Sequence, residues 1–389
     1  MNKDIVFWLD GPPVCCKGLF DKVAEKWQGN AYYICTGGLD ENRALILNDC
    51  GENDGTGCAK YYYLEKMSDK EQFMSDFLQQ HRTDIHVFNG YKSCSAKYMR
   101  QLMRLDRNAH ILIWAERPHL AVLSGNPIKR YIFSVAHRIN HIMYAKKYSN
   151  RVAALLPVGE KGVEAYSKLG WSMNRLFPVL YLPEMAIPET VMENQPTEDC
   201  IRFIYLGRFS AEGKGLDLLL DACKLLKNDN YTLELVGGYG DYKEKTMEII
   251  ASDPHLCFGG TWPISEACQR LHNYDVCIVP SRLEGWNVTV NEAIMAGIGC
   301  IVTEEAVSDE MIAVSGAGIV TKASSASIAE AMDRVMENPE LVKRFKDAAY
   351  AYRERTTADV CAKYFIDVVM YLFGENRNYV RPIPPWINE

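Results

Sequence analysis

The stretch from Asp275 to Gly297 constrains the fold of this chain more than any other. Residues 275–279 (DVCIV) are apolar and rich in β-branched side chains, which predicts a buried strand. Pro280 ends that strand because proline has no N–H to give to a sheet ladder. A helical pattern then runs from Trp286 to a terminal glycine. Free N–H groups and the helix dipole face whatever lies beyond such a strand, so the stretch predicts an anion site.

Two glutamates flank the start of this predicted helix. Glu284 comes just before it, and Glu292 lies two turns inside it among apolar neighbours. Burying a carboxylate costs free energy unless the group is paired or hydrogen-bonded. We therefore expect Glu292 to face donors such as sugar or ribose hydroxyls. Taken alone, the stretch leaves open a solvated helix that carries two ordinary glutamates.

Strand and helix patterns alternate along the whole chain, which predicts α/β domains with parallel, doubly wound sheets. The predicted strands are residues 4–9, 31–35, 85–88, 111–114, 174–182, 202–206, 231–236, 256–258, 275–279, 300–303 and 318–320. Ligands of such sheets lie beyond the carboxyl ends of the strands. In the first half, that position is taken by Gly11, residues 89–91 and Glu116.

The predicted domain boundaries follow changes in composition. Residues 1–182 form an N-terminal domain, and residues 183–200, with three prolines and several acids, form a linker. Residues 201–357 form a second domain, and each domain is long enough to have its own core. Residues 358–389 hold an apolar helix and a proline-rich tail, which we expect to return to the first domain.

Composition excludes several classes of protein. A formal net charge of −7 argues against a general nucleic-acid binder. No apolar run approaches the ~20 residues that span a bilayer, and the N-terminus has no apolar leader, so we expect a cytoplasmic protein. The 13 cysteines include no C-x-x-C pair, which favours reduced thiols over zinc ligands or disulfides. The adjacent Cys15 and Cys16 are left without a role.

A cationic stretch covers residues 129–151. No acidic residue occurs between Arg117 and Gly159, whereas lysines and arginines alternate with large apolar residues. This pattern predicts a basic amphipathic helix that lies on an anionic membrane surface. A helix packed by its apolar face, with a solvated cationic side, is the alternative.

A second motif follows the predicted strand 202–206. It is a G-R-x5-K-G run, in which Arg208 offers a planar fork and Lys214 a point charge beside a glycine-rich strand-to-helix turn. Such a turn admits a pyrophosphate close to the backbone. Two exposed cations beside a helix start are the alternative interpretation.

Together, the two glutamates at E-x7-E spacing and the G-R-x5-K-G run resemble the donor-site signature of the retaining family 4 glycosyltransferases (glycosyl transferases group 1). The resemblance covers residues 201–354, while residues 1–180 match only in pattern. It implies the GT-B fold, in which two Rossmann-like doubly wound domains face each other across a cleft and the C-terminal helix crosses back to the first domain. It also implies a hexosyltransferase that moves a sugar from a nucleotide diphosphate to a glycan or lipid-linked acceptor with retention of configuration.

The resemblance further implies roles for individual residues. Arg208 and Lys214 would stabilise the departing diphosphate, and Glu284 and Glu292 would hold the hydroxyls of the sugar and of the ribose. Main-chain N–H groups from Gly285 to Asn287 would assist at the diphosphate. The implied donor-binding residues are Gly11, Gly207, Gly237, Gly238, Thr261, Trp262, Gly285, Trp286, Asn287 and Glu292. The implied catalytic residues are Arg208, Lys214, Glu284 and Glu116.

The chain departs from the family pattern at two places. Its first loop reads Gly11-Pro12-Pro13, where the family usually has a glycine-rich turn, and Glu116 stands where the family often has a histidine. Glu116 is either a carboxylate at the reaction centre or the partner of Arg117. Alternatives of another class are a catalytically inactive sugar-nucleotide-binding subunit and a GT-B epimerase or phosphorylase.

No cofactor or metal is expected, because the cations take over the charge of the diphosphate and no D-x-D cluster demands an ion. The family resemblance places the reaction in the assembly of a bacterial surface polysaccharide. The corresponding location is the cytoplasm, with peripheral binding to the inner face of the cell membrane.

Overall fold

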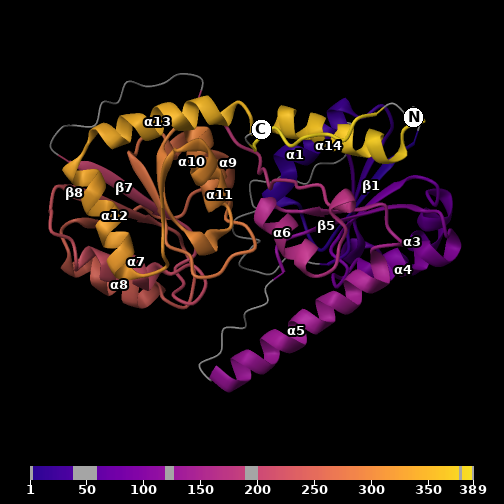
Figure 1. Ribbon diagram of the computed structural model, residues 1–389, viewed down its shortest axis with the longest axis horizontal. Coiled ribbons are helices and arrows are strands. Elements are labelled where there is room, and N and C mark those ends of the chain that lie inside the picture. The colour runs from indigo at the N-terminus through magenta and orange to yellow at the C-terminus, as the bar shows by residue number, and fades with distance from the viewer. Residues whose placement is uncertain (1–2, 38–58, 119–126, 189–199, 376–378, 388–389) are drawn as a thin grey trace. The chain divides into compact units, whose positions relative to one another are not determined.

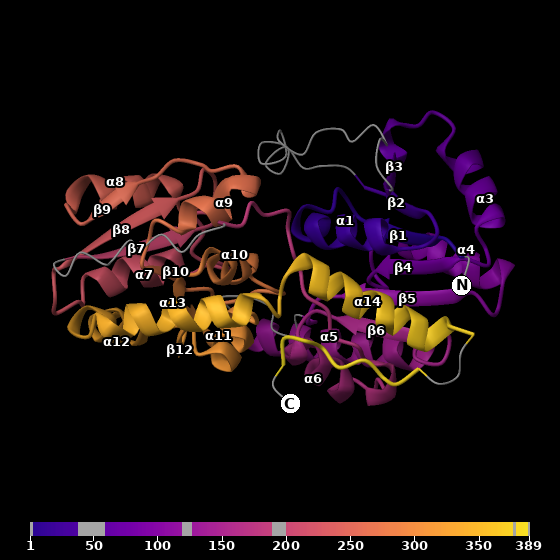
Figure 2. The same ribbon diagram turned by 90° about the horizontal axis from the view of Figure 1, so that it is seen from above.

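The chain folds as two compact units. The computed structural model describes residues 3–37, 59–118, 127–188, 200–375 and 379–387. The first unit extends to Leu182 and includes Ala358–Pro384, and the second takes Pro183–Thr357 and the residues from Pro385 onward. Figures 1 and 2 show the two units in two views.

The first unit is built on a parallel six-stranded sheet of order β3-β2-β1-β4-β5-β6. The strands are β1 (Ile5–Leu9), β2 (Ala31–Cys35), β3 (Ala59–Tyr63), β4 (Ile85–Asn89), β5 (His110–Ala115) and β6 (Ala154–Pro157). β1 and β2 are buried along their whole length, as expected for strands covered on both faces. The strand order reverses between β1 and β4, which marks the switch point where such sheets bind ligands.

Helices cover both faces of this sheet. On one face α1 (Lys17–Lys26) packs beside α14 (Ala358–Phe373), and Phe7 of β1 contacts Phe365 at 5.7 Å between ring centroids. The core on the other face takes residues from α3 (Lys70–Gln80), α4 (Ala96–Leu105), α6 (Glu160–Lys168) and the end of α5 (Pro127–Tyr148). Short 3-10 turns are η1 (Val14–Cys16), η2 (Leu64–Lys66) and η3 (Met173–Arg175).

Only the last turns of α5 are buried. Ala145 and Tyr148 pack into the core, whereas the N-terminal part of the helix projects beyond the other helices of its unit (Figure 1). The exposed apolar side chains of this part include Ile128, Tyr131, Ile132, Phe133, Val135, Ile139, Ile142 and Met143. A helix is therefore present in the predicted cationic stretch, and many of its large apolar side chains are exposed.

The second unit repeats the strand order of the first. Its sheet is parallel, with the order β12-β11-β10-β7-β8-β9, so the switch point lies between β7 and β10. The strands are β7 (Ile201–Leu206), β8 (Tyr231–Val236), β9 (Leu256–Phe258), β10 (Val276–Val279), β11 (Gly299–Thr303) and β12 (Gly318–Thr321). Two doubly wound, Rossmann-like sheets confirm the predicted fold class.

Seven helices of the second unit are described. α7 (Leu216–Cys223) and α12 (Ser325–Glu337) pack together on one face of the sheet, and α8 (Lys243–Ser252) lies beside β9. A second group consists of α9 (Ile264–Leu271), α10 (Val288–Ala296), α11 (Asp309–Ser315) and α13 (Glu340–Arg353), with the short turn η4 (Glu304–Ala306). α10 is buried along almost its whole length, which explains why its sequence shows little helical amphipathicity.

One predicted strand is wrong. Residues 174–182 begin in η3 and pair with the sheet only through two isolated bridges, Leu155 to Leu176 and Val158 to Val179. Pro178 lies between these bridges and has no N–H to continue a ladder. The last strand of the first sheet is instead β6, which the sequence analysis missed together with β3.

The C-terminal segment also differs from its prediction. α14 lies in the first unit, where Lys26 of α1 forms a 2.8 Å ion pair with Asp359. Trp386 instead belongs to the second unit, where it is 2% exposed and its carbonyl accepts a 2.8 Å hydrogen bond from the hydroxyl of Tyr352. The tail therefore does not stay with the first unit to its end.

The cysteines in the described part of the chain are all free thiols, which agrees with the prediction of no disulfide framework there. Within the same residues, every helix is too short or too polar to cross a membrane. Residues 189–199 of the predicted linker lie outside the described residues.

Candidate functional site

The residues of both sequence motifs meet at the switch point of the second sheet. Residues 207–215 follow β7 and residues 280–287 follow β10, and these are the two strands between which the strand order reverses. The loops contact each other directly, because the N–H of Arg282 donates to the carbonyl of Gly213 at 2.9 Å. The hydroxyl of Thr289 in α10 also donates to the carbonyl of Leu206, at 3.3 Å.

Close packing explains three glycines around the site, two of them against backbone and one against the side chain of Thr261. Gly215 has a φ of +67°, and a Cβ there would lie 2.0 Å from the carbonyl oxygen of Pro280. A Cβ at Gly237 would lie 2.0 Å from the carbonyl oxygen of Gly207, and one at Gly238 would lie 2.3 Å from Oγ1 of Thr261. Any side chain at these positions would push the loops apart.

An ion pair connects the two loops at the centre of the site. Nζ of Lys214 lies 2.6 Å from Oε1 of Glu284, and the two side chains are 19% and 14% exposed. The hydroxyl of Ser281 donates to the same carboxylate oxygen at 3.2 Å. Nδ2 of Asn287 donates to Oγ of Ser281 at 3.2 Å, and Oδ1 of Asn287 caps α10 by accepting from the N–H of Thr289. Glu284 is thus held by Lys214 and by Ser281, and Ser281 in turn contacts Asn287, the residue that caps α10.

Glu292 is a buried carboxyl group without a partner of its own. Its side chain makes no hydrogen bond or ion pair with any residue that the structure describes, although the residue is only 5% exposed. Burial raises the pKa of Glu292 to about 8, and the charge of Lys214 opposes that rise. At neutral pH the carboxyl group is therefore mostly protonated, and it lies close enough to Lys214 to interact with its charge.

Arg208 is exposed and forms no ion pair with the described residues. It lies close to the pair of Lys214 and Glu284, because both Arg208 and Glu284 act on the buried hydroxyl of Tyr205. Burial and Glu284 raise the pKa of Tyr205, and Arg208 lowers it. That hydroxyl donates to the carbonyl of Arg208 at 2.5 Å, which fixes the loop after β7.

At the start of α10, one expected backbone donor already has a partner within the protein. The N–H of Asn287 donates to the carbonyl of Ala306 at 3.2 Å, so it is already used within the protein and is not free for a diphosphate. The indole of Trp286 is buried and donates to Oδ1 of Asn291 at 2.8 Å. Both side chains support the loop that carries Glu284, and Gly285 between them is buried as well.

The residues expected near the nucleotide base follow β9. Thr261 is exposed, whereas Trp262 is buried and its indole N–H donates to the carbonyl of Gly259 at 3.1 Å. The guanidinium of Arg270 lies 5.4 Å from the centre of the Trp262 ring. Trp262 is therefore packed between protein groups, and Thr261 offers the accessible hydroxyl of this pair.

Gly11 and Glu116 belong to the first unit, after β1 and β5. Glu116 is exposed, and its carboxylate hydrogen-bonds the buried hydroxyl of Tyr181, whose pKa rises through burial and this contact. The same carboxylate contributes to the raised pKa of the Cys16 thiol, after burial and Cys15. These two residues are thus placed in a different unit from Arg208, Lys214, Glu284 and Glu292.

Sequence reasoning missed Ser281 and Tyr205, the two hydroxyls that hold this constellation together. Ser281 is the second residue after the end of β10, so its position beyond a strand's carboxyl end was an available signal. Tyr205 lies inside β7 among apolar residues, and the sequence gives no sign that its hydroxyl reaches the next loop.

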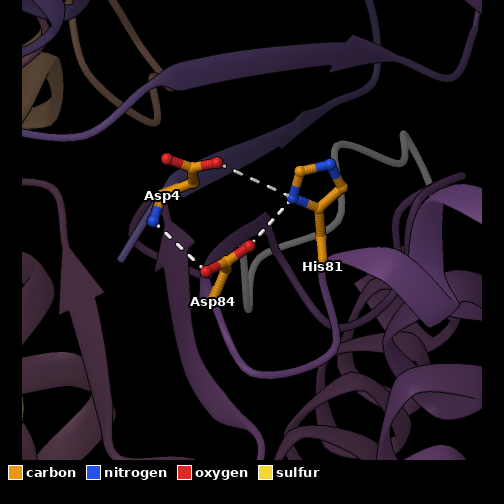
Figure 3. Close-up of side chains that lie close together, drawn as sticks. All are labelled: Asp4, His81 and Asp84. Carbon is orange, nitrogen blue, oxygen red and sulfur yellow. Dashed lines mark hydrogen bonds and ion pairs between the residues drawn. The ribbon is translucent and has the colours of Figure 1, made fainter. Parts of the chain in front are cut away.

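One group of side chains in the first unit has the composition of a metal site (Figure 3). Ligand atoms of Asp4, His81 and Asp84 lie within 4.8 Å of one another. Nδ1 of His81 is 2.8 Å from the carboxylate of Asp84, and Asp4 accepts hydrogen bonds from Asn30. The cluster lies at the amino ends of β1 and β4, opposite the edge where parallel sheets bind ligands. These hydrogen bonds account for it as a structural group, and the expectation that no metal is required stays a prediction.

Comparison with known proteins agrees with this geometry. Residues 188–352 match the family model described as glycosyl transferases group 1. An uncharacterized 41.2 kDa protein in the cps region of Klebsiella pneumoniae is 27% identical over 142 residues, which cover 36% of this chain and 38% of that protein. The matched part thus spans well under half of the length of this curated relative.

Solved structures share the fold over nearly the whole chain. HepE of Anabaena, crystallised with UDP and glucose, is 14% identical and covers 95% of this chain and all of its own, with a TM-score of 0.68. WaaG, a glycosyltransferase involved in lipopolysaccharide biosynthesis, is 13% identical and covers 94% of this chain and 99% of its own, with a TM-score of 0.61. The chain therefore has the GT-B fold.

Proposed function

We propose that the protein is a GT-B hexosyltransferase, which moves a sugar from a nucleotide diphosphate to a glycan or lipid-linked acceptor with retention at the anomeric carbon. The observation that carries the proposal is the Lys214–Glu284 ion pair, with the buried Glu292 beside it at the switch point of the second sheet. The match to group 1 glycosyl transferases over this part of the chain supports it.

The cations of this site would act on the leaving group. When the bond between the anomeric carbon and the diphosphate breaks, negative charge grows on the phosphate oxygen. Lys214 and the exposed Arg208 would stabilise that charge, and electrostatic stabilisation of this kind is usually the largest part of catalysis. Glu284 would then accept hydrogen bonds from the hydroxyls of the transferred sugar.

Glu292 would hold the ribose. A buried carboxyl group without a partner is costly, and the two ribose hydroxyls supply the missing hydrogen-bond donors. HepE of Anabaena has been crystallised with UDP-glucose, which makes a nucleotide sugar the first donor class to test for this chain. We expect Thr261 and the loop that carries Gly237 and Gly238 to lie near the nucleotide base.

The acceptor is proposed to be linked to a lipid. The exposed apolar residues of α5 include Ile128, Ile132, Val135, Ile139 and Ile142, whose spacing of four and three residues forms a single stripe on a helix. Lys129 and Lys147 lie to one side of that stripe and Arg138 to the other, at 100° per residue. An apolar stripe between cations fits an anionic membrane surface, so we place the enzyme on the inner face of the cell membrane.

The biological setting follows from the relatives. One lies in a cps region, and WaaG takes part in lipopolysaccharide biosynthesis. Both are consistent with a role for this chain in the assembly of a bacterial surface polysaccharide.

Slow donor hydrolysis tests the proposal directly. Purified protein is incubated with a panel of nucleotide sugars, and the released nucleoside diphosphate and the anomer of the free sugar are followed by NMR. Release with retention, abolished in Glu284→Ala, is the expected result. Binding without release would favour an inactive sugar-nucleotide-binding subunit, and conversion of the sugar or a requirement for inorganic phosphate would indicate an epimerase or a phosphorylase.

A further inference from the structure

We infer that Lys92 and His141 bind a phosphate group of the acceptor, at the switch point of the first sheet. The inference rests on the proposed function and adds to it the chemical class of the acceptor, which is a phosphate ester or diphosphate. Neither residue belongs to the donor site, which lies in the other unit.

Lys92 occupies the position where a doubly wound sheet binds its ligand. It follows β4 after a turn at Gly90, whose φ of +76° favours glycine. The strand order of the first sheet reverses between β1 and β4, so the loops after these strands border the ligand crevice. The carboxylate of Asp10, after β1, accepts a 3.1 Å hydrogen bond from the N–H of Cys94 and connects the two loops.

Lys92 lacks a counter-ion. Its side chain is exposed, no carboxylate among the described residues forms an ion pair with it, and the burial that it does have lowers its pKa. Its Nζ lies 3.2 Å from Nε2 of His141 and 5.4 Å from the centre of the Tyr144 ring. An ammonium group held by neutral partners beside a ligand crevice is suited to an anionic ligand.

The surroundings of His141 add positive charge and no negative charge. His141 comes from α5 and is buried, and its pKa is lowered to about 4 by burial, then by Lys92 and by His137 one turn earlier. The other groups facing it are the hydroxyl of Tyr91 and the ring of Tyr144 beneath Lys92. Residues 118–158 contain no acidic side chain that could pair with this positive charge. An anion that binds here must therefore come from another part of the chain or from a ligand.

A chain of hydrogen bonds fixes the orientation of His141. Lys92 donates to Nε2, so the proton of the neutral ring lies on Nδ1 and is donated to the hydroxyl of Tyr91. Tyr91 in turn hydrogen-bonds Tyr166, whose hydroxyl donates to the carbonyl of Glu116 at 2.9 Å. Hydrogen bonds therefore connect the proposed phosphate site to the backbone of Glu116, the residue that follows β5.

Pyrophosphate is a direct probe of this site. The protein is prepared with Arg208→Ala and Lys214→Ala, so that the donor site no longer competes, and the ring signals of His141 are followed by NMR during a pH titration. Pyrophosphate is expected to raise the pKa of His141, because an anion stabilises the imidazolium. An unchanged His141 titration at saturating pyrophosphate, or no pyrophosphate binding at all, would overturn the inference.

Matched substitutions distinguish pyrophosphate binding at this site from non-specific attraction of pyrophosphate to lysine side chains. Lys92→Gln is expected to weaken pyrophosphate binding about tenfold or more, as loss of a charged hydrogen bond does. Lys97→Gln is the control, because Lys97 is exposed on the following helix and lies over the ring of Tyr98. Equal effects of the two substitutions would also refute the site.

Acceptor kinetics distinguish the two sources of phosphate. Sugar chains on a short prenyl diphosphate and soluble sugar phosphates are compared as acceptors, and Lys92→Gln should raise the KM of whichever class is used. Failure of donor hydrolysis in the unsubstituted protein would count against the proposed function alone, because pyrophosphate binding at Lys92 is measured without any donor.

Discussion

Replacing Glu292 by glutamine tests the central feature of the donor site. The buried carboxyl group has a pKa of about 8, against an ordinary value of 4.5. The folded protein therefore retains a proton that the unfolded chain gives up between these two values. The contribution of this bound proton to the free energy of unfolding is fully present below pH 4.5 and is lost as the pH rises through about 8.

The magnitude of this loss follows from proton linkage. Stability should fall by up to about 1.4 kcal/mol for each pH unit between 4.5 and 8, relative to a protein with a neutral side chain at this position. Glu292→Gln keeps the size of the side chain and removes its titration. We therefore expect the substitution to be nearly neutral at pH 5 and clearly stabilising at pH 8.5.

Chemical denaturation at several pH values measures this difference. The denaturant midpoints of the unsubstituted protein and of Glu292→Gln should diverge steadily from pH 5 to 8.5. Glu212→Gln is the matched control, because Glu212 is exposed in the neighbouring loop, and it should follow the unsubstituted protein. Parallel pH profiles for Glu292→Gln and the unsubstituted protein would show that Glu292 is ionised in the folded state, and the reasoning would fail.

Three further predictions test the proposed roles. Arg208→Ala and Lys214→Ala should each lower kcat about a hundredfold without unfolding the protein, and near-normal kcat in both would reject the phosphate site. Glu284→Ala should impair turnover while the free nucleoside diphosphate still binds in calorimetric titration, and a loss of that binding would contradict a sugar-specific role. Lys146→Gln combined with Lys147→Gln should reduce binding to anionic vesicles at low salt, since each cation near the surface contributes about 1 kcal/mol; binding that ignores lipid charge would exclude electrostatic docking.

The sequence predicted elements with a strong periodic pattern and missed those without one. The bounds of β2 and β8 agree with their predictions, because both segments are rich in apolar and β-branched residues that favour strands. β6 has four residues and ends in a proline, and β3 lies at the edge of its sheet with an exposed lysine, so neither gives a clear signal. Residues 174–182 have the composition of a strand, but Pro178 interrupts their pairing.

The candidate site was predictable in position more than in contacts. The motifs that follow β7 and β10 predicted that Lys214, Glu284 and Glu292 lie near one another, because adjacent parallel strands end at the same edge of the sheet. Spacing along the chain carries no information on which side chains pair across two loops. The sequence analysis therefore assigned Lys214 to the diphosphate and Glu284 to the sugar, whereas in the structure the two side chains form an ion pair. It also offered the N–H of Asn287 to a ligand, although Ala306 already accepts it.

The anchoring of Trp386 makes the second unit dependent on the last residues of the chain. A fragment of residues 183–357 would have every strand of its sheet and would still lack the tryptophan whose carbonyl Tyr352 binds. Arg355 would likewise lose the carbonyl of Pro385, which it binds at 2.7 Å. Deleting a large buried side chain costs about 3–5 kcal/mol, so removal of residues 385–387 would destabilise the second unit, although α14 separates these residues from the rest of that unit in the sequence.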